Sequence, residues 1–145
     1  METTTSETIF PVRYAETDQM GIVHHSVYPV WFECGRTEFV QRFGVSYAEV
    51  EQAGAMLPLL KLTCEYHLPL QYGQTAHVRT RLILATKTRL TFGYAVYDRP
   101  DGPVCAIGTT EHAWTDKRLR PVNLSRHLPD LYERLAPMYD MAMGE

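Results

Sequence analysis

Residues 14–36 read YAETDQMGIVHHSVYPVWFECGR, and this stretch joins the end of a strand, a polar loop and an aromatic-rich helix without a gap. The residues just before it, 9–14, are rich in β-branched and aromatic side chains, which predicts a short strand. Asp18 and Gly21 belong to a run of turn-forming residues that predicts a loop after this strand. The rest of the chain is expected to support this segment.

A long helix is expected to begin near Ser26. Pro29 is tolerated in a first helical turn because its missing N–H would have no partner there, so we expect the main-chain amides of residues 25–27 to be free donors. Apolar and small side chains then cover more than one face of the helix, which predicts that other elements wrap around it. These side chains are Val30, Trp31, Phe32, Cys34, Gly35, Phe39, Val40 and Phe43.

The remaining pattern predicts a second helix followed by strands. Residues 46–49 form a Ser-x-x-Glu capping box for a short helix that ends near Gly54. Alternating apolar and polar residues predict half-buried strands in the segments 60–68, 76–84, 90–97 and 104–115. The turn residues 98–103 predict an antiparallel hairpin, and residues 125–135 a last short helix. This order predicts an α+β fold in which a mainly antiparallel, curled sheet wraps around one long helix.

The size and charge of the chain exclude several classes of protein. Its 145 residues fit a single domain over positions 1–145, of which residues 1–8 are expected to be frayed. A formal net charge of −3 offers no general attraction for nucleic acid. The chain shows neither a signal peptide nor a segment as long and apolar as a membrane span. We therefore expect a cytoplasmic protein with no nucleic-acid or membrane partner.

The spacing of histidines and cysteines predicts no metal site, because no His-x-x-x-His or Cys-x-x-Cys pair occurs. Cys34, Cys64 and Cys105 are far apart and odd in number, so we expect reduced, buried thiols. The motifs of serine hydrolases, phosphate loops and dinucleotide-binding enzymes are absent from the sequence. No metal and no cofactor are therefore expected.

The motif Tyr-x-Glu-Thr-Asp-x-x-Gly-Ile-Val-x-His-x-x-Tyr occupies residues 14–28, and Phe32-Glu33 and Arg36-Thr37-Glu38 follow it. In this order and spacing the chain resembles the 4-hydroxybenzoyl-CoA thioesterase-like branch of the hot-dog-fold acyl-CoA thioesterases. The resemblance implies a hot-dog fold and a homodimer or homotetramer. It also implies hydrolysis of an acyl-CoA to a free acid and coenzyme A without a cofactor.

The resemblance implies roles for four residues of this motif. The aspartate that matches Asp18 is catalytic in the family, either as nucleophile or as general base; without the motif, Asp18 would be read as a loop cap. The main-chain N–H of His25 would polarise the thioester carbonyl, while its ring either positions reactants or binds a loop carbonyl. Gly21 would permit either a backbone conformation or a close approach of another group that a side chain at this position would block. The Tyr28 side chain would either contact the substrate or only pack against its neighbours in the core.

The resemblance also implies where coenzyme A and the acyl group bind. Lys87 and Arg89 match a basic region of the family that binds its phosphates, sometimes from a neighbouring subunit; solvated loop charge is the alternative. Glu33 is a second carboxylate, for which an ion pair with Arg36 is expected; an acid/base role is the alternative, because another hot-dog branch uses a helical glutamate. Val27 replaces an asparagine that is common in the family. The acyl pocket is expected at a dimer interface, lined by residues such as Met20, Ile22, Trp31, Leu57 and Leu59.

Two other functions stay open on the sequence. Hot-dog dehydratases and hydratases bind acyl thioesters, but they use a histidine and a carboxylate from facing segments, whereas Asp18 and His25 share one loop. A non-catalytic acyl-CoA binding module is the other alternative, and the intact Asp18 argues against it. The sequence does not reveal the acyl chain, or whether coenzyme A or a carrier protein bears it.

Overall fold

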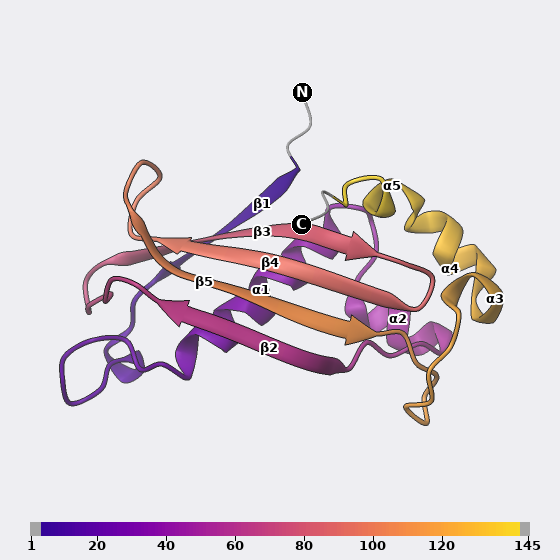
Figure 1. Cartoon of the computed structure of the whole chain (residues 1–145), viewed down its shortest axis with the longest axis horizontal. Coiled ribbons are helices and arrows are strands. Elements are labelled where there is room, and N and C mark those ends of the chain that lie inside the picture. Colours follow the sequence, from indigo (N-terminus) through magenta and orange to yellow (C-terminus); the bar gives the residue numbers. More distant parts are fainter. Residues whose placement is uncertain (1–3, 143–145) are drawn as a thin grey trace.

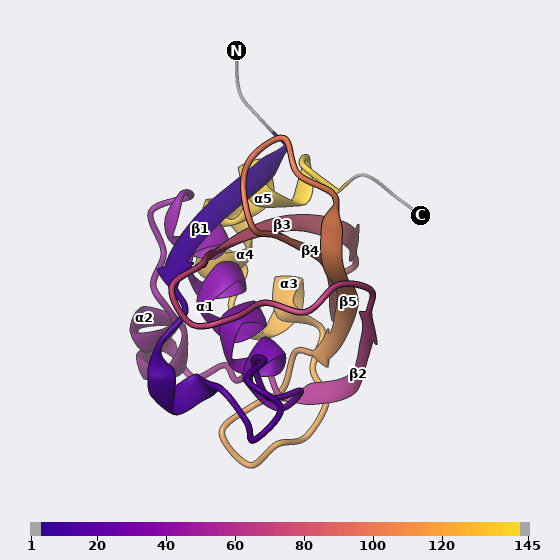
Figure 2. The same cartoon turned by 90° about the vertical axis from the view of Figure 1, so that its left-hand side faces the viewer.

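Figure 1 shows the computed structural model of the chain, which describes residues 4–142. The strands are β1 (Thr5–Pro11), β2 (Leu59–Tyr66), β3 (Thr75–Ala85), β4 (Arg89–Tyr97) and β5 (Val104–Ala113). They form one antiparallel sheet in the order β1-β3-β4-β5-β2. The helices are η1 (Tyr14–Glu16, a 3-10 turn), α1 (Val27–Gln41), α2 (Tyr47–Ala53), α3 (Leu124–His127), α4 (Pro129–Arg134) and α5 (Ala136–Tyr139). Seen end-on, the sheet curls around α1 (Figure 2), which confirms the predicted architecture.

The core lies between α1 and the concave face of the sheet. Phe32 and Phe39 are fully buried, and the Phe32 ring stacks on Tyr94 of β4 at a centroid distance of 4.3 Å. Gly108 permits this close packing, because a Cβ at that position would lie 2.5 Å from the Phe32 ring. The prediction of a wrapped helix is therefore confirmed for this side of α1. Val30, which is 54% exposed, marks a side that is left open.

The N-terminal strand differs from its prediction. It spans Thr5–Pro11 instead of residues 9–14. The prediction that residues 1–8 are frayed is therefore wrong for residues 5–8, and residues 1–3 lie outside the described part of the chain. Ser6 and Thr8 point inward and are 7% and 5% exposed. The Thr8 hydroxyl donates a hydrogen bond of 2.6 Å to a carboxylate oxygen of Glu38 on α1. Buried polar residues thus conceal this strand from an analysis of apolar periodicity.

The other predicted elements are found with two differences. The Ser46 capping box is present, with the Glu49 amide donating to the Ser46 hydroxyl at 3.1 Å. The predicted helix over residues 125–135 is instead divided between α3, α4 and the residues beyond them, because Pro129 begins a new helix. Strand β2 is found, but its predicted burial is wrong: Leu60 and Leu62 are 50% and 38% exposed. Within residues 4–142, no element covers this edge of the sheet.

A chain of hydrogen bonds crosses the core beside α1. Nδ1 of His112 lies 3.2 Å from the Leu57 carbonyl and therefore carries the ring proton, while Nε2 accepts from the Thr110 hydroxyl at 2.9 Å. The Tyr94 hydroxyl in turn donates to Thr110 at 2.6 Å. His112 is 1% exposed. Burial, assisted by the nearby Arg36 guanidinium, lowers the pKa of His112 to about 4.

Acidification from pH 7 to pH 5 is expected to destabilise the protein by about 2 kcal/mol through His112. The unfolded chain binds a proton at this histidine near pH 6.5, whereas the folded chain does so only near a pKa of about 4, so falling pH favours unfolding within this window. Urea unfolding at both pH values measures the effect. His112→Asn keeps a donor toward Leu57 but does not titrate. Equal losses of stability in this variant and in the wild type would contradict the assignment.

Candidate active site

The loop that precedes α1 is tightly held. The Asp18 amide donates to the Ile22 carbonyl at 2.8 Å, and the Gly21 amide donates to the Asp18 carbonyl at 2.9 Å. Gly21 has a φ of +82°, in the left-handed region that favours glycine. No atom lies within 4 Å of a Cβ added there. Gly21 is therefore needed for the backbone conformation of the loop, and not for close approach of another described residue.

Asp18 both caps this loop and offers a carboxylate oxygen. Its Oδ1 accepts a hydrogen bond of 2.9 Å from the Met20 amide. Its Oδ2 has no hydrogen-bond partner among residues 4–142, and the side chain is half-buried. The capping role that the sequence suggested as an alternative is thus present. It uses one oxygen and leaves the second available to a ligand.

Of the three amides predicted to be free where the chain enters α1, only that of His25 has no partner among residues 4–142. The Ser26 amide donates to Nδ1 of His24 at 3.1 Å, and the Val27 amide donates to the His24 carbonyl at 3.0 Å. The prediction of free amides is therefore wrong for Ser26 and Val27. The His25 amide donates to no other described residue, as predicted. The exposed His25 ring lies against the His24 ring at a centroid distance of 4.1 Å and binds no carbonyl in the described chain.

An open pocket of about 290 Å³ joins these groups. It contains Asp18, His25 and Tyr28 from the predicted site, together with apolar side chains. The lining residues are Asp18, Met20, Ile22, Val23, His25, Tyr28, Tyr66, His67, Leu68 and Pro69. Of the residues expected around the acyl group, Met20 and Ile22 are present. Trp31, Leu57 and Leu59 are absent from the lining; Trp31 instead stacks on Phe10 in the core.

Tyr66 is one of five pocket residues that the sequence did not single out, with Val23, His67, Leu68 and Pro69. Its hydroxyl donates a hydrogen bond of 2.8 Å to the His25 carbonyl, and its ring meets Tyr28 edge-to-face at a centroid distance of 5.1 Å. Burial, with a contribution from Cys64, raises the pKa of Tyr66 to about 12. Burial likewise raises the pKa of Tyr28 to about 12. Both hydroxyls therefore remain protonated donors at neutral pH, and Tyr66 fixes the peptide that follows the free amide.

With this geometry in view, comparison with known proteins identifies the family. The sequence profile of the thioesterase-like superfamily matches residues 12–143. The chain belongs to this superfamily. It is 38% identical over 120 residues to the Bacillus subtilis protein named "Putative acyl-CoA thioesterase YneP", covering 82% of this chain and 86% of that protein.

Solved structures agree with this assignment. A DHNA-CoA thioesterase from Staphylococcus aureus superimposes with a TM-score of 0.85 at 29% identity, over 94% of this chain and 92% of that one. A hypothetical protein from Thermus thermophilus gives a TM-score of 0.81 at 37% identity, over 92% and 97% of the two chains. The fold is therefore that of the hot-dog thioesterases, as the sequence motif predicted.

One chain of this thioesterase-like protein does not assemble all the predicted binding residues. Arg89 pairs with Ala113 at one end of the sheet, whereas Tyr66, which lines the pocket, pairs with Ala106 at the other end. In Figure 1 the β3–β4 turn that carries Lys87 lies at the right, and the loop before α1 lies at the lower left. Lys87 and Arg89 are therefore far from Asp18 within the chain.

The remaining polar candidates lie outside the pocket. Glu33 is on an exposed side of α1, with its carboxylate 3.9 Å from the Arg36 guanidinium, so the expected ion pair is present at long range. Among residues 4–142, no group of three histidine, cysteine or acidic side chains is placed to hold a metal ion. The same residues contain no helix long and apolar enough to cross a membrane. The cysteines are free thiols; of these, Cys105 is buried and Cys34 and Cys64 are half-buried.

Proposed function

We propose that this protein hydrolyses an acyl-CoA to a free acid and coenzyme A, with Asp18 as the catalytic carboxylate. One observation carries the proposal: Asp18, with a free carboxylate oxygen, and His25, with a free amide, line a single pocket that is otherwise largely apolar. Membership of the thioesterase-like superfamily supports the same reaction, as does the name of the Bacillus subtilis relative.

The pocket supports the following mechanism. The thioester carbonyl oxygen accepts a hydrogen bond from the His25 amide, at the positive end of the α1 dipole, so negative charge that develops on this oxygen is stabilised. Asp18 either attacks the carbonyl carbon or removes a proton from the water that attacks it. The C–S bond then breaks, and the thiolate departs and takes up a proton. Where Asp18 is the nucleophile, this leaves a mixed anhydride, which water hydrolyses to the free acid and the regenerated Asp18 carboxylate. Tyr28, as a protonated hydroxyl, is a further donor toward the acyl group.

The exposed edge of the sheet supports a homodimer. Strand β2 presents Leu60 and Leu62 to solvent at the edge of the sheet, and such an apolar edge favours pairing with another strand. Symmetric antiparallel pairing of two β2 edges would bring Lys87 and Arg89 of the second copy to the end of the sheet that holds Asp18. Lys87 and Arg89 would then supply a cationic surface for the phosphates of coenzyme A. Gly21 and Tyr28 would lie beside the acyl group of the substrate.

Release of free thiol from a panel of aromatic and aliphatic acyl-CoAs tests the proposed reaction. The proposal predicts turnover of at least one thioester by the purified protein, with one acid and one thiol formed per thioester consumed. Binding of every acyl-CoA without thiol release over many hours would favour the non-catalytic module. Loss of a carbon–carbon double bond with the thioester intact would instead identify a hydratase or dehydratase.

Tyr66→Phe is expected to lower kcat about fivefold with little change in KM, because a hydrogen bond worth about 1 kcal/mol holds the loop that carries the His25 amide. The phenyl ring still packs on Tyr28, so the fold should be unaffected. Tyr72→Phe, at a tyrosine that is 65% exposed and outside the pocket lining, is the matched control. A rise in KM at constant kcat would show that Tyr66 binds substrate instead of positioning the loop.

A further inference from the structure

Hydrogen bonds on both sides of the free His25 amide fix its direction. The peptide before it is held through the His24 carbonyl, which accepts the Val27 amide at 3.0 Å. Because a trans peptide is planar, this carbonyl directs the His25 N–H to the opposite side. The peptide after it is held at both ends. Its carbonyl accepts the Tyr66 hydroxyl at 2.8 Å, and its amide, that of Ser26, donates to Nδ1 of His24 at 3.1 Å.

The His24 ring is the part of this arrangement that responds to pH, because an imidazole changes charge near neutral pH and the other groups do not. Besides the Ser26 amide, the Ser26 hydroxyl lies 2.8 Å from Nδ1. Ser26 is the N-cap of α1, where a serine side chain usually accepts from the first turn, but here it makes no such bond. Both donors of Ser26 are thus directed at one nitrogen, which must be unprotonated to accept from them.

Protonation of the His24 ring would remove this acceptor. The Ser26 hydroxyl can turn and accept from the new N–H, but the Ser26 amide then faces another donor. Among residues 4–142, His24 has no ion pair that would stabilise the charged ring. Glu16 of η1 accepts the His24 amide with its main-chain carbonyl at 2.8 Å, but its carboxylate binds Arg13. The first turn of α1 has no acidic residue.

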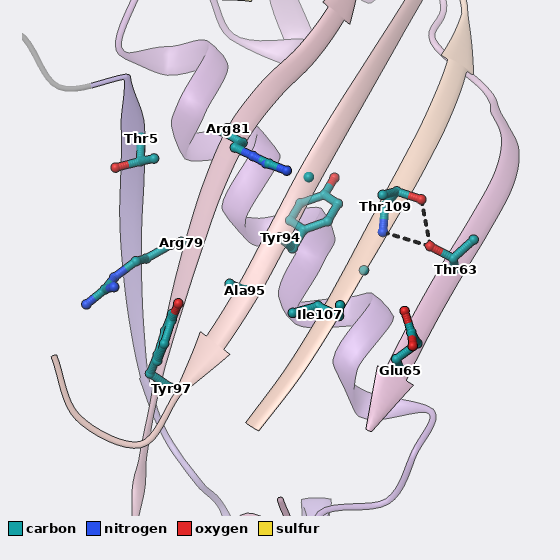
Figure 3. A pocket seen from close by; sticks show the side chains of 12 residues that line it. Thr5, Thr63, Glu65, Arg79, Arg81, Tyr94, Ala95, Tyr97, Ile107 and Thr109 are labelled. Carbon is teal, nitrogen blue, oxygen red and sulfur yellow. Dashed lines mark hydrogen bonds between the residues drawn. The ribbon is translucent and has the colours of Figure 1, made fainter. Parts of the chain in front are cut away.

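Other titratable groups lie near the pocket and must be separated from His24. The His25 ring lies against the His24 ring at a centroid distance of 4.1 Å, and Asp18 and His67 line the pocket. His24 itself is half-buried and outside the pocket lining. The larger groove of about 390 Å³ on the outer face of the sheet has no histidine among its lining residues (Figure 3). A change of charge near neutral pH therefore concerns the Asp18 pocket and not this groove.

We propose that His24 is a positioning residue for the hydrolysis proposed above, and that protonation of its ring lowers kcat by releasing the Ser26 amide. This role rests on the proposed function, since the released peptide adjoins the His25 amide that binds the thioester carbonyl. The neutral ring holds one end of this peptide while Tyr66 holds the other. Because the His24 ring is outside the pocket lining, its protonation leaves KM little changed.

His24→Asn and His24→Leu separate the acceptor from the rest of the ring. An asparagine oxygen can accept the amide two residues on and does not titrate, whereas leucine has a similar shape and no acceptor. At pH 7, His24→Leu is expected to lower kcat about fivefold, the factor for one neutral hydrogen bond, and His24→Asn to restore most of it. From pH 7 to pH 5, kcat of the wild type should fall about fivefold more than that of His24→Asn.

His127→Asn is the matched control, at an exposed histidine of α3 outside the pocket lining, and should keep the pH profile of the wild type. His112 is retained in every variant, so its effect on stability is common to all. Wild-type kcat in His24→Leu at pH 7 overturns the proposal. Equal acid losses of kcat in the wild type and in His24→Asn overturn it as well, because a merely structural role would leave the pH profile unchanged.

The Ser26 amide provides a readout that needs no substrate. In amide NMR spectra of the isotope-labelled protein, its resonance should move between pH 7 and pH 5 in the wild type and stay fixed in His24→Asn. An unmoved resonance in a wild type that releases thiol overturns the role of His24 alone. A wild type that releases no thiol at either pH defeats the proposed function, and with it the effect on kcat, whatever the Ser26 resonance does.

Discussion

Asp18→Asn is expected to lower kcat for thioester hydrolysis by about a hundredfold or more, which is the range for loss of a catalytic base or nucleophile. The asparagine side-chain oxygen can still accept the Met20 amide, so the turn should keep its shape. The change therefore removes the charge and basicity of the free oxygen and little else. Thiol release under saturating and limiting substrate gives kcat and KM for both proteins.

The matched control is Asp101→Asn, in the exposed turn between β4 and β5, where a carboxylate is lost at a residue outside the pocket lining. This control should hydrolyse thioesters like the wild type. An Asp18→Asn protein with wild-type kcat would leave Asp18 as a turn cap alone. A loss of activity accompanied by a lower unfolding midpoint would trace the effect to the loop and not to the chemistry.

The local parts of the site could be predicted from the sequence because each depends on neighbours in the chain. Asp18, Gly21 and the amide of His25 lie within eight consecutive residues. Turn chemistry and the beginning of the helix fix their relative positions. The sequence overestimated only the number of free amides, since the His24 ring and carbonyl accept from two of them. Whether Asp18 acts on a thioester remains a prediction.

The contribution of Tyr66 could not be predicted in this way. It follows from the pairing of β2 with β5, which brings residues 41 positions apart into a hydrogen bond. The same limit applies to Lys87 and Arg89, which a single sheet places at the wrong end for Asp18. The exposed leucines of β2 point to the same cause. Their apolar alternation predicted a buried face. This prediction holds only if a second chain covers the leucines.

Leu62→Glu is expected to separate the proposed β2 edge pair. Burial of a leucine is worth about 2 kcal/mol, and two-fold symmetry makes each substitution count twice, so dimer dissociation should become easier by roughly a thousandfold. The introduced carboxylates also resist removal from water. Light scattering after size-exclusion chromatography should therefore report half of the wild-type molar mass. Leu119→Glu, at a leucine that is 59% exposed in a turn, should leave the mass unchanged.

Separation of the edge pair should also raise KM for acyl-CoA by about tenfold or more, because each charge-assisted hydrogen bond from Lys87 or Arg89 of the second copy is worth about 1.5–3 kcal/mol. A thioester of N-acetylcysteamine lacks the phosphates of coenzyme A. Its KM should therefore change much less in the monomer, which separates loss of phosphate binding from damage to the Asp18 pocket. Equal changes for both substrates would mean that the second copy shapes the pocket itself, and an unchanged mass would remove the edge dimer.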